Sequence, residues 1–182
     1  MSERLRADAG LYEVLEEVAR ARAITSYLEI GVQEGDSLRR VLAAAPQLEH
    51  LLLCDTWCRT YGGTGRGSSA HIEALLSSLS YRGSVQYLTG RSQDTLPKFR
   101  LANSTARFDL VTVDGDHSEA GAGSDLSHGW ALCGGVLVAH DTEFPEVWRA
   151  ILAFGRAHAD EATATAYFGG HGTIIFSREA TA

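Results

Sequence analysis

The feature that most constrains the fold is the stretch 24–45, where an apolar, β-prone run changes into an amphipathic helical pattern. The helix is expected to begin at Asp36 or Ser37, because either side chain can serve as an N-cap. Gly31 and Gly35 lie between the two patterns. Glycine adopts positive φ freely and has no Cβ that would keep a ligand from the backbone. The stretch therefore predicts a strand, a tight turn and a helix, with a cofactor bound at the turn.

A charged residue stands at the end of the apolar run, where burial would be costly. Glu29 precedes Gly31 by two residues, and a buried carboxylate destabilises a fold unless something uses its charge. The glycine spacing after this acid is G-x-x-x-G, whereas the dinucleotide fingerprint requires G-x-G-x-x-G. The turn is therefore not that of a typical NAD-binding fold.

The pattern Glu-x-Gly-x-x-x-Gly-x-Ser, which runs from Glu29 to Ser37, resembles motif I of the class I S-adenosylmethionine (SAM)-dependent methyltransferases. This resemblance implies that Glu29 faces the positively charged methionine end of SAM. It also implies that Gly31, Gly35 and Ser37 belong to the cofactor site. Taken alone, the motif is also compatible with another nucleotide-binding turn or with a turn that is only structural.

The order of the remaining elements predicts the fold class. Helices are expected over 11–23, 36–45, 69–79, from about 92, over 119–132 and after Pro145, and strands over 24–30, 48–54, 85–88, 108–113, 136–139, 162–168 and 173–177. This alternation is typical of an α/β protein with a mostly parallel sheet. With the resemblance, it implies a Rossmann-like methyltransferase fold of seven strands, with helices on both faces and a C-terminal antiparallel hairpin. We expect one domain, 1–182, that opens with a lead-in helical segment, 1–23.

Polar residues stand at the carboxyl ends of five expected strands, namely Glu29 with Gly31, Asp55, Ser92, Asp114, and His140 with Asp141. In open α/β sheets, ligands bind at this edge, near the point where the strand order reverses. Asp55 ends the second strand a little over twenty residues beyond the glycine turn. An acid at that position hydrogen-bonds a ribose diol in nucleotide-binding folds, so we assign Asp55 to the cofactor.

The segment after the third strand carries a second resemblance. Gly90-x-Ser92-Gln93-Asp94 resembles the G-x-S-Q-D segment of the catechol O-methyltransferases, which implies that Ser92 and Gln93 contact the adenine. Without the family, the same residues predict an ordinary turn, with Ser92 as an N-cap and Pro97 near the start of the next helix. The two interpretations are compatible.

The segments 108–117 and 134–141 resemble the O-methyltransferases of the cephalosporin, macrolide-sugar and rhamnosyl type. The resemblance implies a Mg²⁺ site at Asp114, His140 and Asp141, with Asp114 also near the cofactor and His117 as the base. His140 departs from the family, which usually has a carboxylate there. Imidazole suits Zn²⁺, Fe²⁺ or Co²⁺ better than Mg²⁺, so the identity of the metal, and whether one binds, stay open.

These residues lead to one expected function and two alternatives. The expected function is SAM-dependent O-methylation of a hydroxylated small molecule, a sugar or phenol of natural-product biosynthesis, because a base and a metal both help a hydroxyl to lose its proton. The first alternative is a non-catalytic SAM-binding partner or regulatory domain. The second is a nucleotide-dependent oxidoreductase or epimerase, which the missing G-x-G-x-x-G and the absence of a Tyr-x-x-x-Lys pair disfavour.

Composition narrows the partners. A formal net charge of −7 with scattered Arg residues argues against nucleic acid, and no apolar run approaches the ~20 residues that a membrane span needs. The three cysteines show no metal-ligand or disulfide pattern, so a reducing cytoplasm is expected. The glycine-rich segment 56–69 is expected to be a lid or an acceptor-binding loop. A homo-oligomer is an expectation from the resemblance.

Overall fold

The computed structural model describes residues 5–58 and 67–178. The strands are β1 (Ser26–Ile30), β2 (His50–Asp55), β3 (Ser84–Thr89), β4 (Phe108–Val113), β5 (Cys133–His140), β6 (Ala162–Tyr167) and β7 (Thr173–Arg178). The helices are α1 (Leu11–Arg22), α2 (Asp36–Ala44), α3 (Ser69–Ser78), α4 (Ser92–Ala102), α5 (Glu119–Leu132) and α6 (Pro145–Ala157). The sequence patterns therefore predicted the type and order of these elements correctly.

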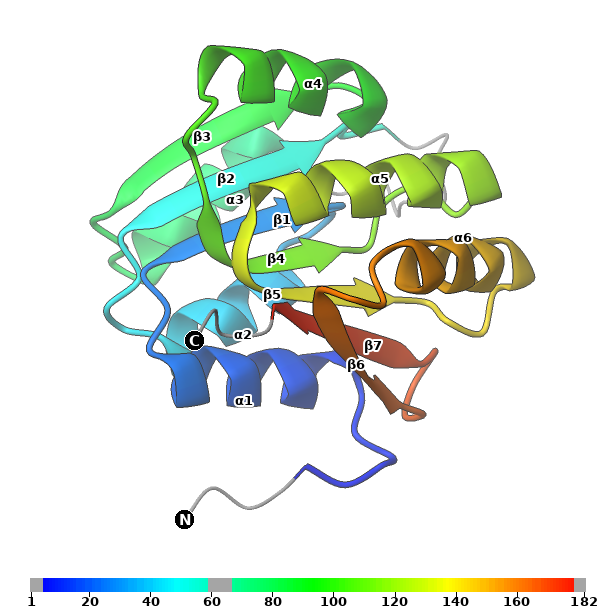
Figure 1. The fold of residues 1–182 in the computed structure, drawn as a ribbon. Helices are drawn as coiled ribbons and strands as arrows, with labels where there is room; N and C mark the ends of the chain where they lie inside the picture. Colours follow the sequence, from blue (N-terminus) through cyan, green and yellow to red (C-terminus); the bar gives the residue numbers. More distant parts are fainter. Residues whose placement is uncertain (1–4, 59–66, 179–182) are drawn as a thin grey trace.

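The strands form one sheet in the order β3-β2-β1-β4-β5-β7-β6 (Figure 1). Strands β1 to β5 are parallel, and β7 pairs antiparallel with both β5 and β6. The chain moves outward from β1 to β3 and then returns to add β4 on the other side of β1. The strand order thus reverses between β1 and β4, and such a reversal is where open α/β sheets bind ligands. The expected Rossmann-like sheet with its C-terminal hairpin is confirmed.

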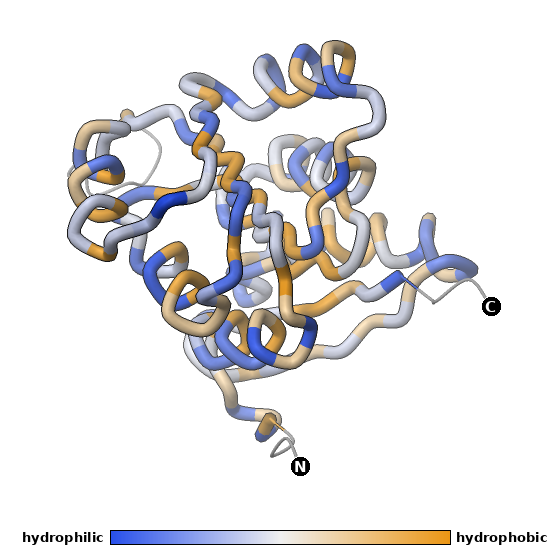
Figure 2. The backbone as a smooth tube through the Cα atoms, turned by 90° about the vertical axis from the view of Figure 1, so that its left-hand side faces the viewer, coloured by the Kyte–Doolittle hydropathy of each residue, from blue (hydrophilic) through white to orange (hydrophobic). Residues whose placement is uncertain are grey.

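Helices cover both faces of the sheet (Figure 1). On one face α4, α5 and α6 pack in a hydrophobic cluster with Leu28 and Ile30 of β1. On the other face α1, α2 and α3 pack in a second cluster with Tyr27 of the same strand. In Figure 2, hydrophobic segments run through the middle of the molecule, and the helices around them alternate between hydrophilic and hydrophobic residues. Strands buried on both faces need apolar residues at successive positions, which explains their nearly continuous apolar runs.

The N-caps of two helices differ from the expectation, although α2 begins at Asp36 as expected. The N-cap of α2 is Gly35, at φ +81°, rather than Asp36 or Ser37, and no side chain caps this helix. Asp36 instead pairs with Arg39 at 2.8 Å, and the Ser37 hydroxyl donates to the Glu29 carboxylate. The sequence shows which residues can cap a helix, but it cannot show that a buried acid competes for the same hydroxyl.

The N-cap of α4 is Arg91, so Ser92 is the first helical residue rather than the N-cap. Pro97 lies inside α4 instead of near its start. The Ser92 hydroxyl is turned toward a buried acid of α5, as described below, and is therefore not used as a cap.

Strand β5 begins at Cys133, directly after α5 ends at Leu132, and therefore three residues before the strand expected over 136–139. A Cβ at Gly135 would press against the backbone carbonyl oxygen of Asp109 on β4. The pairing of β4 with β5 is also irregular between Phe108 and Leu110. Gly135 is therefore needed because β4 and β5 approach each other closely at this point. In the sequence alone, such a glycine looks like a turn signal.

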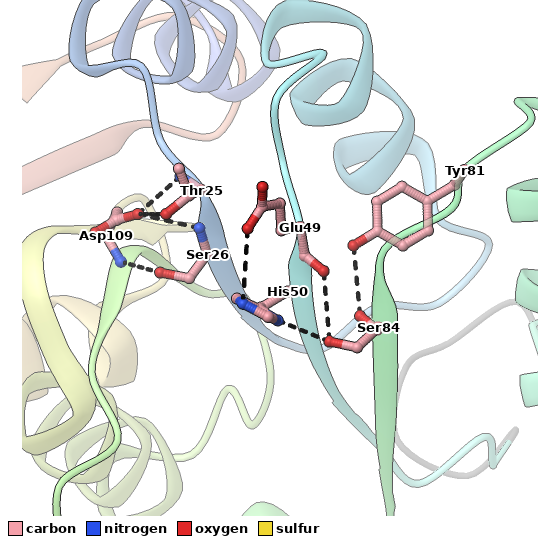
Figure 3. A network of polar contacts seen from close by, with 7 residues as sticks. All are labelled: Thr25, Ser26, Glu49, His50, Tyr81, Ser84 and Asp109. Atoms are coloured by element: carbon pink, nitrogen blue, oxygen red, sulfur yellow. Dashed lines mark hydrogen bonds and ion pairs between the residues drawn. The ribbon is translucent and has the colours of Figure 1, made fainter.

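The amino ends of the central strands are joined by a polar network (Figure 3). One Asp109 carboxylate oxygen accepts hydrogen bonds from the backbone N–H of Thr25 (2.8 Å) and of Ser26 (3.0 Å) and from the Thr25 hydroxyl (3.0 Å). Partial burial raises the pKa of Asp109, but these hydrogen bonds outweigh it and hold the pKa below its usual value. A second contact joins the starts of β2 and β3, where a His50 ring nitrogen lies 2.8 Å from the Ser84 hydroxyl.

Within residues 5–58 and 67–178, no helix is both long and apolar enough to span a membrane.

Candidate active site

Two hollows open at the edge where β1, β2, β4 and β5 end, the side toward which their arrows point in Figure 1. We call the first the groove; its lining comes from residues 30–33, 54–58, 90–93 and 114–116. We call the second the cavity; it measures about 400 Å³ and is lined by residues 10–13, 31–34, 36–37 and 170–171 with Asp114 and His140. The groove and the cavity share Gly31, Gln33 and Asp114. They are therefore adjoining spaces separated by the β1–α2 turn and the end of β4.

Gly31 is the tightest point of this turn. It has φ +88°, its N–H donates to the carbonyl of Cys54 (2.9 Å), and the Asp114 N–H donates to the carbonyl of Ile30 (2.8 Å). A Cβ on Gly31 would overlap the carbonyl oxygen of Asp114. Only glycine allows the turn to lie against the end of β4 in this conformation.

Asp55 shapes the groove from the end of β2. One of its carboxylate oxygens accepts from the backbone N–H of Val32 (2.7 Å) and of Gln33 (2.8 Å), and the other accepts from the N–H of Trp57 (2.6 Å). A carboxylate offers about four lone-pair sites, so these bonds leave capacity toward the groove. The acid both holds the glycine turn and lines the space beside it.

Glu29 lies beneath the turn and is fully buried. One carboxylate oxygen accepts from the Ser37 hydroxyl, and the other has no hydrogen-bond partner among the described residues. Burial raises the pKa of Glu29 to about 8, although the hydrogen bond from Ser37 opposes the shift. The carboxyl is therefore mostly protonated at neutral pH in this state. Ser37 lines the cavity, so Glu29 stands just behind its wall.

The far end of the groove depends on an acid that the sequence patterns did not single out. Gln93 donates to the Asp116 carboxylate (3.2 Å), and the Asp116 backbone N–H donates to the Asp125 carboxylate (3.3 Å). Asp125 comes from the middle of α5 and is fully buried. Burial raises its pKa to about 6, against a hydrogen bond from Ser92 that lowers it. Asp125 thus links the first residue of α4 to the segment after β4. The available signal in the sequence was an acid on the buried face of a helix.

Asp114, His140 and Asp141 come together as expected from neighbouring strands β4 and β5. Each offers one ligand atom, and these atoms lie within 4.8 Å of one another. His140 Nδ1 is 3.2 Å from an Asp114 oxygen and 3.3 Å from an Asp141 oxygen. Burial raises the pKa of Asp114; burial also lowers that of His140, but Asp114 outweighs it and the net pKa of His140 is raised. Two carboxylates and an imidazole are a donor set that divalent cations use.

His117 lies on the outer side of Asp141. Its Nε2 is 2.8 Å from an Asp141 oxygen, and its ring centroid is 5.0 Å from that of Phe144. The hydrogen bond with Asp141 raises the pKa of His117, and about half of the side chain is exposed. Among the described residues that line the cavity, the imidazoles are His140 and His171. The structure therefore joins His117 to the Asp114, His140 and Asp141 cluster but not to the cavity wall.

Most of the cavity wall was not predicted from the sequence, and the missed residues include Tyr12 of α1 and His171 of the β6–β7 turn. For His171 a signal existed. Strand β7 pairs antiparallel with β5, with Thr173 opposite His140, which brings the β6–β7 turn to the edge where β5 ends. The glycine-rich loop expected to be a lid falls largely on residues 59–66, which lie outside the described residues. Beside them Cys58 lines the groove.

Comparisons with known proteins agree with this geometry. A comparison with curated proteins gives no match. The O-methyltransferase TomG from Streptomyces achromogenes, involved in tomaymycin synthesis and solved with SAM, has TM-score 0.70 and 21% identity, with 93% of this chain and 79% of that chain covered. An O-methyltransferase from Bacillus cereus, in complex with SAH, has TM-score 0.68 and 16% identity, with 92% and 80% covered. The O-methyltransferase NovP has TM-score 0.68 and 15% identity, with 93% and 79% covered.

At these identities the structural likeness shows the shared fold, and the sequence comparison carries the assignment further. A family model described as a methyltransferase domain matches residues 28–142, from β1 to just past β5. The match includes the glycine turn, Asp55, the groove and the Asp114, His140 and Asp141 cluster. The chain therefore belongs to this methyltransferase domain family.

Proposed function

We propose that this protein is a SAM-dependent O-methyltransferase that acts on a hydroxyl group of a small molecule, a sugar or phenol of natural-product biosynthesis. The observation that carries the proposal is the meeting of the groove and the cavity at Gly31, Gln33 and Asp114. Methyl transfer requires donor and acceptor to be held in contact and in line. Two adjoining spaces with a candidate metal cluster at their junction suit that requirement.

The groove is the proposed cofactor site. SAM supplies a methyl group attached to a positively charged sulfur. Gly31 would bring the backbone of the turn close to the ligand, and Gly35 would let the turn close, since its missing Cβ leaves room for Ile72 and Leu75 of α3. Asp55 would accept from the ribose, and Ser92 and Gln93 would contact the adenine. Glu29 stands behind the wall of the adjoining cavity, so it would face SAM where the methionine end reaches the junction of the two spaces at Gly31. There, a buried carboxylate oxygen without a partner among the described residues would favour a nearby positive charge.

Asp114, His140 and Asp141 are the proposed holders of a divalent metal. Such an ion would lower the pKa of an acceptor hydroxyl beside it. The two carboxylates suit Mg²⁺, whereas the His140 imidazole favours a softer ion. The ligand atoms are already gathered within 4.8 Å, which supports binding without a large rearrangement.

His117 is the proposed proton acceptor. Asp141 accepts from its Nε2, which fixes the ring and leaves Nδ1 to take a proton. Because His117 does not line the cavity, this role requires the acceptor hydroxyl to reach the Asp114, His140 and Asp141 cluster, which His117 contacts through Asp141. Replacing His117 with Ala should lower turnover by about 100-fold, the low end for loss of a positioned base, and leave SAH affinity nearly unchanged. Steady-state rates and calorimetric titration with SAH measure the two effects. His71→Ala, an exposed change on α3, is the matched control. Equal loss of rate and of cofactor affinity would contradict the assigned role.

The test of the whole proposal is a thermal-shift titration with SAM, SAH and NAD(H), each with and without Mg²⁺, Mn²⁺, Co²⁺ or Zn²⁺. A ligand at about 100 times its dissociation constant adds about 2.7 kcal/mol of stability, which a protein of this size reveals clearly. Stabilisation by SAM and SAH, with a further shift from one metal, is the expected result. Stabilisation by NAD(H) alone would overturn the proposal, and a response to SAM that no metal changes would remove the metal from it.

A further inference from the structure

The β6–β7 turn forms one wall of the cavity, and the structure fixes it firmly in place. The turn runs over 168–172, and within its glycine-rich part, 169–172, His171 is the residue with a side chain larger than hydrogen. Gly170 and Gly172 have φ +60° and +76°. The backbone therefore folds tightly on both sides of His171 and presents the imidazole at the cavity wall.

Two separate segments hold this turn. On one side, the Glu143 N–H donates to the His171 carbonyl (3.1 Å), which ties the turn to the residues that follow Asp141. On the other side, the Gly169 N–H donates to the Ala9 carbonyl (3.2 Å), just before α1. These hydrogen bonds thus fix the position of His171 relative to the candidate metal residues and to the start of α1.

The imidazole itself is oriented by its neighbours. Its Nδ1 is 3.3 Å from a Glu143 carboxylate oxygen. Its ring centroid lies 6.2 Å from Phe144 and 6.3 Å from His140, the latter edge-on at 69°. With Nδ1 directed to Glu143, Nε2 is the ring nitrogen left to bind a ligand, and it can accept from or donate to a hydroxyl according to the tautomer.

We propose that His171 is an acceptor-binding residue, whose Nε2 hydrogen-bonds a second polar group of the acceptor while the hydroxyl that is methylated lies at Asp114. The inference rests on the proposed function and adds the substrate class: a small ring that carries at least two hydroxyls. His140 lies between the two contact points, since it lines the cavity and touches both Asp114 and the His171 ring. Acceptors with a single hydroxyl would lose one of these contacts.

The experiment compares wild type with His171→Ala, His171→Gln and the exposed control His71→Ala. SAH affinity is measured by calorimetry, and methylation of catechol and of methyl α-L-rhamnopyranoside is followed by mass spectrometry with saturating SAM and the metal that stabilises the protein. We expect His171→Ala to raise the acceptor KM about tenfold, as for the loss of one hydrogen bond, with kcat and SAH affinity changed little. His171→Gln, whose amide reaches a similar position, should recover part of the loss.

The outcomes separate this inference from the proposed function. Wild type that binds neither SAM nor SAH would refute the function. Wild type that binds SAH and methylates a probe with the same KM as His171→Ala would overturn the role of His171 alone. The same conclusion follows if SAH-loaded wild type neither methylates nor binds either probe at millimolar concentration, because the cavity would then not accept a hydroxylated ring. A further check is phenol against catechol, since only catechol should respond to the variant.

Discussion

At the residue scale, Glu29 is a fully buried acid with incomplete hydrogen bonding and a raised pKa. One of its two carboxyl oxygens has no hydrogen-bond partner among the described residues, and burial raises the pKa of Glu29 to about 8. In the unfolded chain a Glu titrates near pH ~4.3. Between these two values the folded protein keeps a proton that the unfolded chain releases, so stability falls as pH rises through this range.

Glu29→Gln should remove that pH dependence. We expect the variant without cofactor to be more stable than wild type at pH 8, by an amount on the order of a few kcal/mol at about 1.4 kcal/mol per pKa unit, and nearly equal at pH 4.5. Its SAM affinity should fall, because the amide cannot become negative beside the sulfonium. Thermal unfolding across pH and calorimetry measure both, with the exposed Glu73→Gln of α3 as control. Parallel pH curves for wild type and Glu29→Gln would argue against this reasoning.

The sequence revealed the chemistry of individual residues better than their environment. The cluster of Asp114, His140 and Asp141 was predictable, because parallel neighbouring strands end at one edge of a sheet. Asp125 and His171 were not predicted, because their importance depends on what packs against a helix face or a turn. That information is absent from local periodicity.

At the element scale, the β1–α2 turn can be compared with the β6–β7 turn. Gly31 and Gly170 both have positive φ, but a Cβ on Gly31 overlaps the Asp114 carbonyl whereas a Cβ on Gly170 meets nothing within 4 Å. We expect Gly170→Ala to cost about 1–2 kcal/mol of unfolding free energy from the backbone conformation alone. Gly31→Ala should cost more and should also abolish SAH binding.

Urea unfolding and SAH calorimetry test this pair, and comparable losses in both variants would show that the overlap at Gly31 is relieved without consequence.

The N-caps of two helices also show what sequence patterns cannot predict. The type of each element was clear from periodicity, but Gly35 and Arg91 became N-caps because Ser37 and Ser92 turn their hydroxyls toward buried acids.

At the scale of the whole molecule, the sheet has a binding edge and an opposite edge whose polar contacts join its strands. Asp109 belongs to the second, where it joins the start of β4 to Thr25 and Ser26 (Figure 3). Asp109→Ala should therefore lower the unfolding free energy by about 1–3 kcal/mol, or several degrees in Tm, without changing SAH affinity. The lowered pKa of Asp109 means that its contribution is present above about pH 4 and is lost at more acidic pH.

Differential scanning calorimetry at pH 7 and pH 3 measures this effect, and Asp160→Ala, an exposed change in the turn before β6, provides the control. An Asp109→Ala protein with weakened SAH binding would show that the two edges are coupled. The overall architecture was predictable from the sequence, because strands and helices that alternate along the chain with short connections are compatible with few sheet topologies. The cavity was not, because its wall combines residues from both ends of the chain with the β1–α2 turn, Asp114 and His140.

The mixed origin of the cavity wall determines which substitutions can change it. The stretch matched by the methyltransferase family, 28–142, contains the groove and all candidate metal residues, whereas Tyr12 and His171 on the cavity wall lie outside it. Substitutions at 10–13 and 170–171 can therefore change this part of the cavity wall and leave the matched stretch unchanged. A protein engineer could do the same by exchanging only residues 10–13 and 170–171 between relatives.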